Sequence, residues 1–500
     1  MPHTKEGIKT RREFVKRSAM TAGMLAFGKF ESFSTVKLEV DKDAINKLKS
    51  KFSGSLIVPG DAGYDAARRV FTMNLNPDTD KHPAIVAHCK SEEDVLRCID
   101  FAHRQQLEVA VRSGNHSFLG WGSCDKGMVI DLSQMKGVAV DPAKRKAQVS
   151  TGNTAEEILA ATATYGLAPV LGQCGTVGAG LALGGGLGDV SGKYGTACDN
   201  LVAARVITAD GRTLKTDAVT NEDLFWAIRG GGGNFGVATL FEYQLHPVGE
   251  VLTGSFDYPI SKAKSVLRHF REFMATAPDE LQTTCSLMSD HGGEISVYFV
   301  YAGNLDEGER LLDSFRKFET PDKSSVKRKS FGEIYKPDQG DDGNQDQGDE
   351  GMSCLFGSLK GTYIESLSDD AINLVIECSA QSPSSCGVVF QLDHYVHGQV
   401  CRVAPDATAF GLRKAGAIPI WFWVPWKEEA QSSACMAWSK TTLERLRQYS
   451  GGRVYANYMS TTGEAFVKGV YGSNYPRLAQ LKRKYDPENF FHLNQNILPK

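Results

Sequence analysis

The chain has 500 residues, of which 41% are hydrophobic and 23% are charged, and its formal net charge is -3. This length predicts two domains, or one domain with a large insert. The charge gives no electrostatic basis for binding nucleic acid, and the absence of an apolar run of about 18 residues argues against a membrane span. The eleven cysteines include no CxxC pair, so nothing supports a zinc-ribbon or thioredoxin-like site, and any disulfide pairing stays open.

The start of the chain resembles an export signal. Thr10-Arg11-Arg12-Glu13-Phe14-Val15-Lys16 precedes a modest apolar stretch over residues 19–30. This layout is similar to a bacterial twin-arginine signal, which a translocase reads while it exports folded proteins. The alternative is a basic helix at the start of a cytoplasmic protein. We therefore expect a twin-arginine signal region over residues 1–35, a periplasmic or secreted location, and the twin-arginine translocase as a partner during export.

Strands, helices and glycine turns alternate up to about residue 248. Ser91 is a good N-cap for a helix that runs to about Gln106, because acidic residues fill the first turn after it. Thr154 is expected to cap a second helix through about Tyr165. The strands are predicted at residues 82–86, 107–112, 128–132 and 147–150, and a hairpin at residues 202–215 turns at Asp210-Gly211. A further helix is expected to start at Asn221.

From about residue 250 to 450 the pattern changes to long amphipathic helices and β-rich runs. The helices are predicted at residues 261–274 and 307–318, and the strands at residues 295–301, 388–397 and 418–426. The acidic segment over residues 337–351 predicts a loop. It does not fit a calcium loop, because Gln347 and Ser353 stand where a glycine and a bidentate glutamate are needed. A basic helix over residues 475–485 follows, and residues 490–497 are expected to return to the first domain. The fold class is α+β.

Two glycine-rich segments can present backbone N–H groups to phosphates. One is Arg112-Ser113-Gly114-Asn115-His116-Ser117, and the other is Gly175-Thr176-Val177-Gly178-Ala179-Gly180, which continues into Gly184-Gly185-Gly186. Neither is a Rossmann fingerprint, because the strand–turn–helix frame and the downstream acidic residue are missing. Taken alone, His116 can be a turn histidine with one hydrogen bond, and Cys174 a small buried filler.

Further blocks make these segments resemble a known family. The first segment is similar to the phosphate-binding turn of the vanillyl-alcohol-oxidase-type, or PCMH-type, FAD fold. Gly172-Gln173-Cys174-Gly175, Gly184-Gly185-Gly186-Leu187-Gly188 and Lys193-Tyr194-Gly195 resemble its berberine bridge enzyme-like branch. So do Tyr455-Ala456-Asn457-Tyr458, Lys484-Tyr485-Asp486-Pro487 and Asn494-Gln495-Asn496-Ile497 near the end. These blocks follow one another in the expected order from about residue 80 onward.

The resemblance implies a two-domain PCMH-type FAD-binding fold whose substrate domain is an antiparallel sheet covered by helices. Residues 36–250 would bind FAD, with a core at about 78–248, residues 251–450 would bind substrate, and residues 451–500 would return to the FAD domain. His116 would be bonded to the flavin 8α carbon and Cys174 to C6. The other implied cofactor-binding residues are Arg112, Ser113, Gly114, Asn115, Ser117, Gly120, Gly175, Thr176, Val177, Gly178, Gly180, Leu181, Gly185, Gly188, Asn200, Val206, Asn457 and Asn494.

The resemblance also implies a catalytic tyrosine in the Tyr-x-Asn-Tyr block, which takes a proton from a substrate hydroxyl while hydride passes to flavin N5. The candidates are Tyr455 and Tyr458. On a strand their offset of three places them on opposite faces, and we expect Tyr455 to face the flavin. A tyrosine pKa near 10 requires a charged neighbour for this role, for which His394 and Arg402 are candidates. The alternative is that both tyrosines are ordinary strand aromatics.

Two positions bear on the reaction through the resemblance. Leu187 stands where many relatives have a second active-site tyrosine, in a loop one residue shorter, so a tyrosine-pair mechanism is in doubt. Val177 would lie near the flavin C4a face, where a small side chain leaves space for dioxygen. It therefore favours an oxidase that releases hydrogen peroxide.

The substrate residues are expected on two β-rich runs. Alternate residues of the run from Gln391 are expected to line the pocket, with Gln391 and His394 as candidates. His394 and His397 would face opposite sides of a strand, so no metal site is predicted. Trp421 and Trp423 share one face and can stack on a sugar or an aromatic substrate, or pack in the core.

Together these features predict an FAD-linked oxidase that acts on the CH–OH group of a carbohydrate or a secondary metabolite. Its partners would be that small molecule and dioxygen, without nucleic acid and without a membrane span. Two alternatives stay open: a flavin dehydrogenase with another electron acceptor, and a flavin-carrying binding protein with little turnover.

Overall fold

The computed structural model describes residues 40–72, 79–290, 292–335 and 356–500. The predicted export signal and the predicted loop over residues 337–351 lie outside the described residues. All elements discussed below belong to the unit Lys42–Lys500. Among the described residues, no helix is long and apolar enough to cross a membrane.

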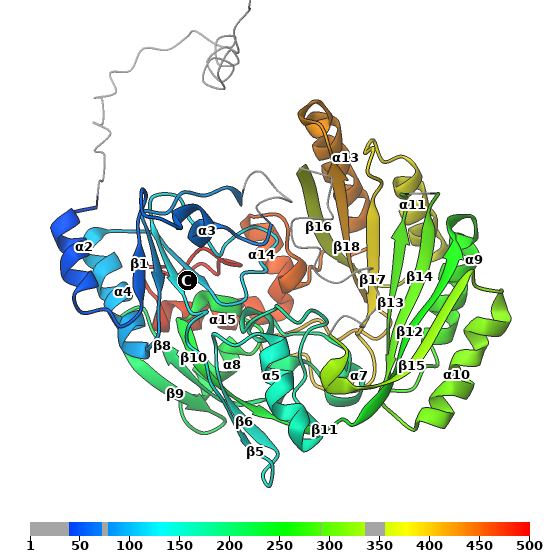
Figure 1. The fold of residues 1–500 in the computed structure, drawn as a ribbon, viewed down its shortest axis with the longest axis horizontal. Coiled ribbons are helices and arrows are strands. Elements are labelled where there is room, and N and C mark those ends of the chain that lie inside the picture. The colour runs from blue at the N-terminus through cyan, green and yellow to red at the C-terminus, as the bar shows by residue number, and fades with distance from the viewer. Residues whose placement is uncertain (1–39, 73–78, 291, 336–355) are drawn as a thin grey trace, which may run out of the picture. The chain divides into compact units, whose positions relative to one another are not determined.

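Two sheets and a short strand pair build the first region (Figure 1). The four-stranded sheet has the order β1-β2-β4-β3, in which β2, β4 and β3 are parallel and β1 is antiparallel to β2. The five-stranded sheet is antiparallel, with the order β5-β6-β10-β8-β9. The strands are β1 (Ser55–Ile57), β2 (Ile85–His88), β3 (Val109–Arg112), β4 (Met128–Asp131), β5 (Val138–Asp141), β6 (Lys146–Ser150), β7 (Leu167–Ala168), β8 (Leu201–Ile207), β9 (Thr213–Asp217), β10 (Val237–Gln244) and β11 (His246–Pro247), the last of which pairs with β7.

Short polar caps start the helices of this region. The Ser91 hydroxyl accepts a hydrogen bond from the amide of Asp94, and Thr154 forms a capping box with Glu157. Both predicted caps are thereby confirmed. The helices are α2 (Lys42–Lys49), α3 (Tyr64–Arg68), α4 (Glu92–Gln105), α5 (Ala155–Thr162), α6 (Gly180–Leu183), α7 (Ser191–Tyr194), α8 (Glu222–Ile228), α14 (Glu464–Tyr471) and α15 (Tyr475–Tyr485).

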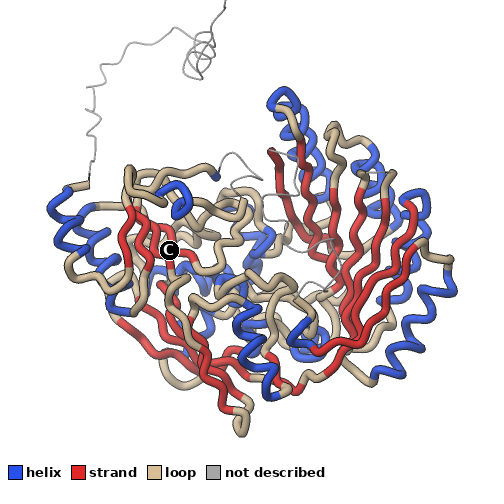
Figure 2. The backbone as a smooth tube through the Cα atoms, in the orientation of Figure 1, coloured by secondary structure: helices blue, strands red, loops and turns tan. Residues whose placement is uncertain are grey.

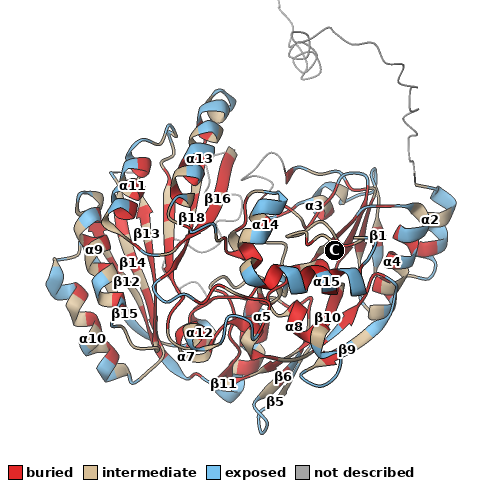
Figure 3. Ribbon diagram, turned by 180° about the vertical axis from the view of Figure 1, so that it is seen from behind, coloured by how far each residue is buried: buried red, intermediate tan, exposed pale blue. Residues whose placement is uncertain are grey.

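The second region is a seven-stranded antiparallel sheet with the order β15-β12-β14-β13-β17-β18-β16 (Figure 2). Helices α9, α10, α11 and α13 cover one of its faces, and their inward residues are buried (Figure 3). The elements are β12 (Glu250–Pro259), α9 (Ala263–Met274), β13 (Leu281–Met288), β14 (Glu294–Tyr301), α10 (Leu305–Phe318), β15 (Lys323–Ser330), β16 (Phe356–Ile364), α11 (Asp369–Ala380), β17 (Val389–His394), α12 (Gln399–Arg402), β18 (Ile418–Trp426) and α13 (Ser432–Arg447). The fold is therefore two-domain α+β, as predicted.

Strand alternation divides the side chains of this sheet between its two faces. Phe390 and Leu392 of β17, like Phe422 and Val424 of β18, belong to the core beneath the helices. The residues between them, such as Gln391, project from the opposite face. That face, which no described helix layer covers, is where the candidate site lies.

The last residues of the chain pack into the first region. The Ile497 amide donates to Asn234 Oδ1 at 2.9 Å, and Ile497 itself is buried. The buried Lys482 donates to Asp486 Oδ2 at 2.6 Å and to the carbonyls of Asn234 and Phe491. This ion pair fixes the segment that borders the cavity described below.

Candidate active site

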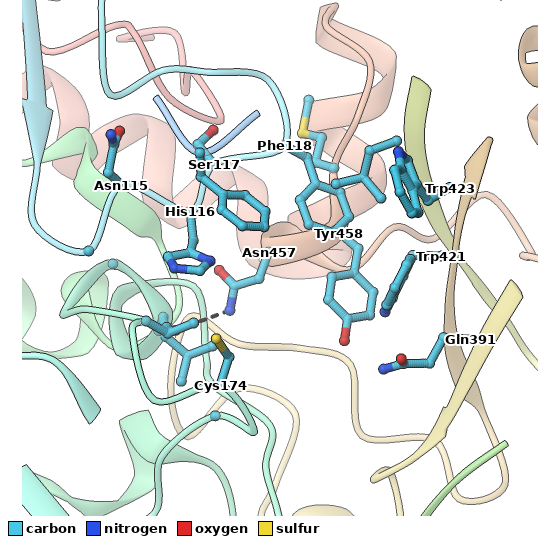
Figure 4. Close-up of a pocket in the computed structure, with 18 of the residues that line it drawn as sticks. Asn115, His116, Ser117, Phe118, Cys174, Gln391, Trp421, Trp423, Asn457 and Tyr458 are labelled. Atoms are coloured by element: carbon cyan, nitrogen blue, oxygen red, sulfur yellow. Dashed lines mark hydrogen bonds between the residues drawn. The ribbon is translucent and has the colours of Figure 1, made fainter. Parts of the chain in front are cut away.

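A cavity of about 2060 Å³ lies between the two glycine turns and the open face of the seven-stranded sheet (Figure 4). Small-molecule pockets usually have roughly 300–1,000 Å³. The cavity therefore has room for a dinucleotide and a substrate together. In Figure 4, His116 and Cys174 project from the turns, Trp421, Trp423 and Gln391 project from the sheet, and Tyr458 lies between the two groups.

A buried ion pair positions the first glycine turn. β3 ends at Arg112, whose Nε donates to Asp131 Oδ2 at 2.6 Å on the neighbouring strand. The same guanidinium donates to the carbonyls of Ala67 and Arg69 at the end of α3, so it ties the end of β3 to β4 and to that helix. Asn115 then adopts the left-handed region with a φ of 65°, which reverses the chain toward His116.

The two glycine turns contact each other directly. A Cβ atom on Gly114 would collide with the amide nitrogen of Gly178, so both positions require glycine. The Ser113 hydroxyl ties the turns together, because it accepts from the amide of Ala179 at 3.2 Å. By contrast, a Cβ on Gly180 or Gly233 would point into open space within the cavity lining. At these two positions the backbone is free to approach a ligand.

His116 and Cys174 meet at one hydroxyl group. Thr176 Oγ1 lies 2.8 Å from His116 Nε2 and 3.2 Å from Cys174 Sγ. Phe71, which the sequence did not indicate, stacks on the His116 ring with centroids 4.4 Å apart. The two side chains that the resemblance assigns to flavin attachment are thus held side by side at the cavity wall.

The lining offers unused hydrogen-bonding groups to a nucleotide cofactor. The buried Oδ1 atoms of Asn115 and Asn494 have no hydrogen-bond partner, although both residues line the cavity. Buried polar atoms are rarely left unpaired, so these atoms suit a bound group. With the open glycines, the paired His116 and Cys174, and the size of the cavity, they make the site fit FAD.

The structure brings together thirteen of the predicted cofactor-binding residues. Those that line the cavity are Arg112, Ser113, Gly114, Asn115, His116, Ser117, Cys174, Val177, Gly178, Gly180, Leu181, Asn457 and Asn494. Seven others lie outside its lining: Gly120, Gly175, Thr176, Gly185, Gly188, Asn200 and Val206. Asn200 bonds to Tyr194, Thr196 and His246, and Val206 is fully buried in β8, so these two support the fold.

The prediction that the Tyr-x-Asn-Tyr block is a strand is wrong. Residues Ala456–Tyr458 form a 3-10 turn, in which the Tyr458 amide donates to the Tyr455 carbonyl at 3.0 Å. As a result, both tyrosines line the cavity instead of pointing to opposite faces. Their ring centroids are 4.9 Å apart.

The two tyrosines differ in what their hydroxyl groups contact. Tyr455 accepts from the Leu187 amide at 3.1 Å and from Asn457 Nδ2 at 3.0 Å, and among the described residues no side chain accepts its proton. Tyr458 donates to Asp393 Oδ2 at 2.5 Å. Burial raises the pKa of both tyrosines above its usual range, so each stays protonated at neutral pH. Tyr458, and not the predicted Tyr455, therefore has a base next to it.

Asp393 is the candidate functional residue that the sequence-based prediction missed. It is fully buried, and burial raises the pKa of its carboxyl group to about 6. Oδ1 accepts from Gln391 Nε2 at 2.9 Å and from Thr284 Oγ1 at 3.0 Å. A carboxyl group with this pKa, bonded to a cavity tyrosine, can take up a proton at physiological pH.

His394 does not line the cavity, which corrects its assignment to substrate binding. It follows Phe390 and Leu392 on the helix side of the sheet and packs edge-on against Phe270. Burial lowers its pKa to about 3, so the ring is neutral. Arg402 is mostly exposed and pairs with Asp279 at 2.5 Å. Neither residue can supply the charge expected beside the tyrosines.

His397 also departs from the sequence interpretation. It lies beyond the end of β17, and its ring centroid is 5.0 Å from that of His394, whereas opposite faces of a strand were expected. Among the described residues, no group of three or more His, Cys, Asp or Glu side chains could hold a metal ion.

The predicted substrate residues Gln391, Trp421 and Trp423 line the cavity. Phe118, from the first turn, stacks on Tyr458 with centroids 5.5 Å apart and meets Trp421 edge-on. Phe118 and Trp421 thus form an aromatic wall next to Tyr458, whose hydroxyl donates to Asp393. Leu187 and Val177 also lie in the lining, and Leu187 contributes its backbone amide to Tyr455.

Comparisons with known proteins agree with this geometry. Residues 83–217 match the family model of an FAD binding domain, and residues 454–498 match the model described as berberine and berberine like. An FAD-linked oxidoreductase of Bacillus subtilis is 29% identical over 460 residues, which cover 90% of this chain and 98% of that protein. The crystal structure of 6-hydroxy-D-nicotine oxidase from Arthrobacter nicotinovorans is 27% identical, with a TM-score of 0.78, and the match covers 90% of this chain and 98% of that one.

A third similarity shows the fold alone. Xylooligosaccharide oxidase from Myceliophthora thermophila, solved with xylobiose, has a TM-score of 0.77 at 21% identity. The match covers 91% of this chain and 99% of that one. The overall fold is therefore shared by enzymes whose names give different substrates.

Proposed function

Because the chain belongs to the berberine bridge enzyme-like family of FAD-linked oxidoreductases, we propose that it oxidises the CH–OH group of a carbohydrate or a secondary metabolite. In this proposal FAD is attached to both His116 and Cys174, and dioxygen is the final acceptor. The observation that carries the proposal is the hydrogen bond from Tyr458, which lines the cavity between the attachment residues and the sheet, to the buried Asp393.

The proton of the substrate hydroxyl group leaves through this pair. The hydroxyl donates to the Tyr458 oxygen, whose own proton already points at Asp393 Oδ2. As the substrate loses its proton to Tyr458, Tyr458 passes its proton to the carboxylate, so no free tyrosinate is needed. Tyr458 can therefore take part in the reaction although its raised pKa keeps it protonated at neutral pH. The C–H hydrogen leaves with its electron pair, and the carbinol becomes a carbonyl group.

FAD, when bound, would supply the acceptor for that hydride; with dioxygen as the final acceptor, the two electrons, the transferred hydrogen and the proton taken up by Asp393 would leave together as hydrogen peroxide. Tyr455 accepts hydrogen bonds from Leu187 and Asn457, so its own proton is left to donate to an oxygen atom in the cavity. It can thereby orient the substrate beside Tyr458. The aromatic wall of Phe118 and Trp421 keeps water away from the pair.

The lining supports a ring-shaped, oxygen-rich substrate. Trp421 and Trp423 project from the same face of β18 and can stack on sugar or aromatic rings. Gln391 lies beside Asp393 and can bond to a second hydroxyl group. The name of one structural neighbour, a xylooligosaccharide oxidase, is in line with a carbohydrate, and that of another, 6-hydroxy-D-nicotine oxidase, with an aromatic metabolite.

The test is a substrate screen of the holoenzyme in an oxygen electrode, with peroxide assayed in parallel. We expect equal molar amounts of oxygen consumed and peroxide formed with at least one sugar or phenolic alcohol. Flavin bleaching without oxygen consumption would instead indicate a dehydrogenase. Tight ligand binding without bleaching would indicate a binding protein, and either outcome would overturn the proposal.

Val177 gives a separate test of the role of dioxygen. It lines the cavity beside the cysteine loop, and Val177→Ile adds one methylene group to a packed wall. We expect stopped-flow reoxidation by dioxygen to slow by roughly tenfold or more, while anaerobic reduction by substrate stays within about twofold. The exposed Val219→Ile serves as the matched control. Equal reoxidation rates in the wild type, Val177→Ile and Val219→Ile would show that Val177 does not control the access of dioxygen.

We also propose export through the twin-arginine translocase, on the basis of Arg11-Arg12 and the apolar stretch that follows. Replacing both arginines with lysine should retain the holoenzyme in the cytoplasmic fraction of a bacterial host, whereas the parent chain should reach the periplasm or the medium. Equal distribution of the two proteins, measured by cell fractionation and immunoblotting, would rule out this route.

A further inference from the structure

Asp189 is a second buried carboxyl group next to the site, and the mechanism above does not use it. It follows the triple glycine and is 1% exposed. Its Oδ1 accepts from Gln173 Nε2 at 3.1 Å, and its Oδ2 accepts from the Tyr335 hydroxyl at 3.2 Å. Among the described residues, no lysine, arginine or histidine pairs with it. A buried carboxyl group without a cation is costly to the fold, which calls for a functional reason.

The partners of Asp189 hold the loop that carries Cys174. Gln173 directly precedes the cysteine. The single hydroxyl hydrogen of Tyr335 lies between the carbonyl of Gly172 and Asp189 Oδ2, and the contact with the carbonyl is the shorter of the two. Asp189 and Tyr335 therefore anchor both residues before Cys174: Gln173 through its side chain, and Gly172 through its backbone carbonyl. This cluster fixes where the thiol points.

The same cluster reaches the catalytic carboxyl group. Gln173 Nε2 has two hydrogens, one for Asp189 and one for Thr284 Oγ1 at 3.2 Å. Thr284 Oγ1 in turn donates to Asp393 Oδ1 at 3.0 Å. Two side chains thus bridge the two carboxyl groups, Gln173 from the cysteine loop and Thr284 from β13.

We propose that Asp189 is a positioning residue of the active site, which fixes the Cys174 loop through Gln173 and whose charge is linked to that of Asp393 through Gln173 and Thr284. The inference rests on the proposed function only in the role it gives to Asp393. Asp189 touches neither substrate nor cofactor in this account. It acts on the proton affinity of Asp393 and on the geometry of the loop.

The repulsion between the two carboxylates predicts the direction in which Asp189 changes the pKa of Asp393. Burial, together with the nearby charge of Asp393, raises the pKa of Asp189 to about 6. Two like charges repel each other equally, so we expect a negative charge on Asp189 to favour the protonated form of Asp393 as well. The titratable groups that face Asp189 are Asp393 and the tyrosines of the surrounding elements, namely Tyr298, Tyr335 and Tyr395. All these tyrosines are buried with raised pKa values and stay neutral, so the two carboxyl groups dominate.

The experiment compares the pH dependence of kcat/KM for the wild-type holoenzyme and Asp189→Asn. Removing the charge lowers the pKa of Asp393, so the acid limb should move down by about half a pH unit or more. At pH 5 the variant should then retain roughly threefold more of its plateau activity than the wild type. Tyr335→Phe, which removes one donor that favours the charged form of Asp189, should move the limb in the same direction by less. An acid limb that stays in place, or moves up, would overturn the inference.

A second measurement does not depend on turnover. Thermal midpoints are recorded for Asp189→Asn, Asp393→Asn and the double variant at pH 5 and pH 8. At pH 5 both carboxyl groups are largely protonated, so the changes in thermal midpoint of the two single variants should add in the double variant. At pH 8 both groups are charged, and either substitution relieves the same repulsion. The rise in midpoint of the double variant should then be smaller than the sum of the two single rises. Additive effects at both pH values would refute the link. If no substrate is oxidised at all, the proposed function fails, and this cycle still decides the role of Asp189.

Discussion

Replacing Asp393 with asparagine should lower kcat/KM by roughly 10²- to 10⁴-fold, the range usually associated with loss of a general base. The amide oxygen of the asparagine can still accept the hydrogen bonds from Thr284 and Gln391, but the asparagine side chain cannot take up the proton of Tyr458. The wild-type rate should rise through pH about 6, where Asp393 ionises, and level off above it. This acid limb should be absent from the variant. The measurement is steady-state oxidation from pH 4.5 to 8.5.

The fold should tolerate this change. Because the pKa of Asp393 is raised from 3.8 to about 6 in the folded state, stability falls as the pH rises between these two values, and the full cost of the buried carboxylate is present above about pH 6. At pH 8 the asparagine variant should therefore be as stable as the wild type, or more so. Asp369→Asn, at the exposed start of α11, is the matched control and should keep full activity. An Asp393→Asn enzyme with wild-type kcat/KM would exclude Asp393 as the base.

Replacing Tyr458 with phenylalanine should lower kcat/KM by roughly 10²- to 10³-fold, because the substrate hydroxyl then has no relay to the carboxylate. The change also removes a hydrogen bond that favours the charged form of Asp393, so the acid limb should move to higher pH than the wild-type value near 6. The upward shift distinguishes this variant from one that merely loosens the site.

Tyr258→Phe is the matched control for this substitution. Tyr258 is more deeply buried than Tyr458, and its hydroxyl donates to the Phe315 carbonyl beneath the helices and away from the cavity. Its kcat/KM and its acid limb should match those of the wild type. If Tyr458→Phe behaves like this control, the proton leaves by another path and Tyr455 becomes the candidate again.

The two tyrosines show where sequence reasoning on the site reached its limit. Tyrosine favours strands, and an isolated Tyr-x-Asn-Tyr block reads as one. The structure instead closes a 3-10 turn between Tyr455 and Tyr458, and the Tyr455 hydroxyl accepts from the Leu187 amide. Contacts made 268 residues apart along the chain decided this geometry, and local propensity could not reveal them.

Strand β17, which carries Gln391 and Asp393, could have been interpreted correctly from the sequence alone. Gln391 and His394 are three residues apart, so they cannot share a face of a strand, whereas Gln391 and Asp393 can. Applying the period of two from Gln391 would have identified Asp393 and placed His394 beneath the helices. The same rule did succeed for Trp421 and Trp423, which both line the cavity.

The glycine segments were the most informative part of the sequence. Motif resemblance located the two turns and the two attachment candidates, and the caps at Ser91 and Thr154 followed from side-chain chemistry alone. Motif position did not separate residues that line the cavity from those that support it, as Asn200 and Val206 illustrate. That distinction depends on which side of a strand or turn meets the cavity.

The most direct test of the central claim, a flavin held at both His116 and Cys174, is the spectrum of the protein after acid denaturation and desalting. We predict that yellow colour stays with the wild-type protein and with each single variant, His116→Ala and Cys174→Ala, and is lost from the protein fraction only in the double variant. The two single variants should also differ in absorption, because each keeps a different bond to the ring. A colourless wild-type protein, with FAD in the small-molecule fraction, would contradict the account.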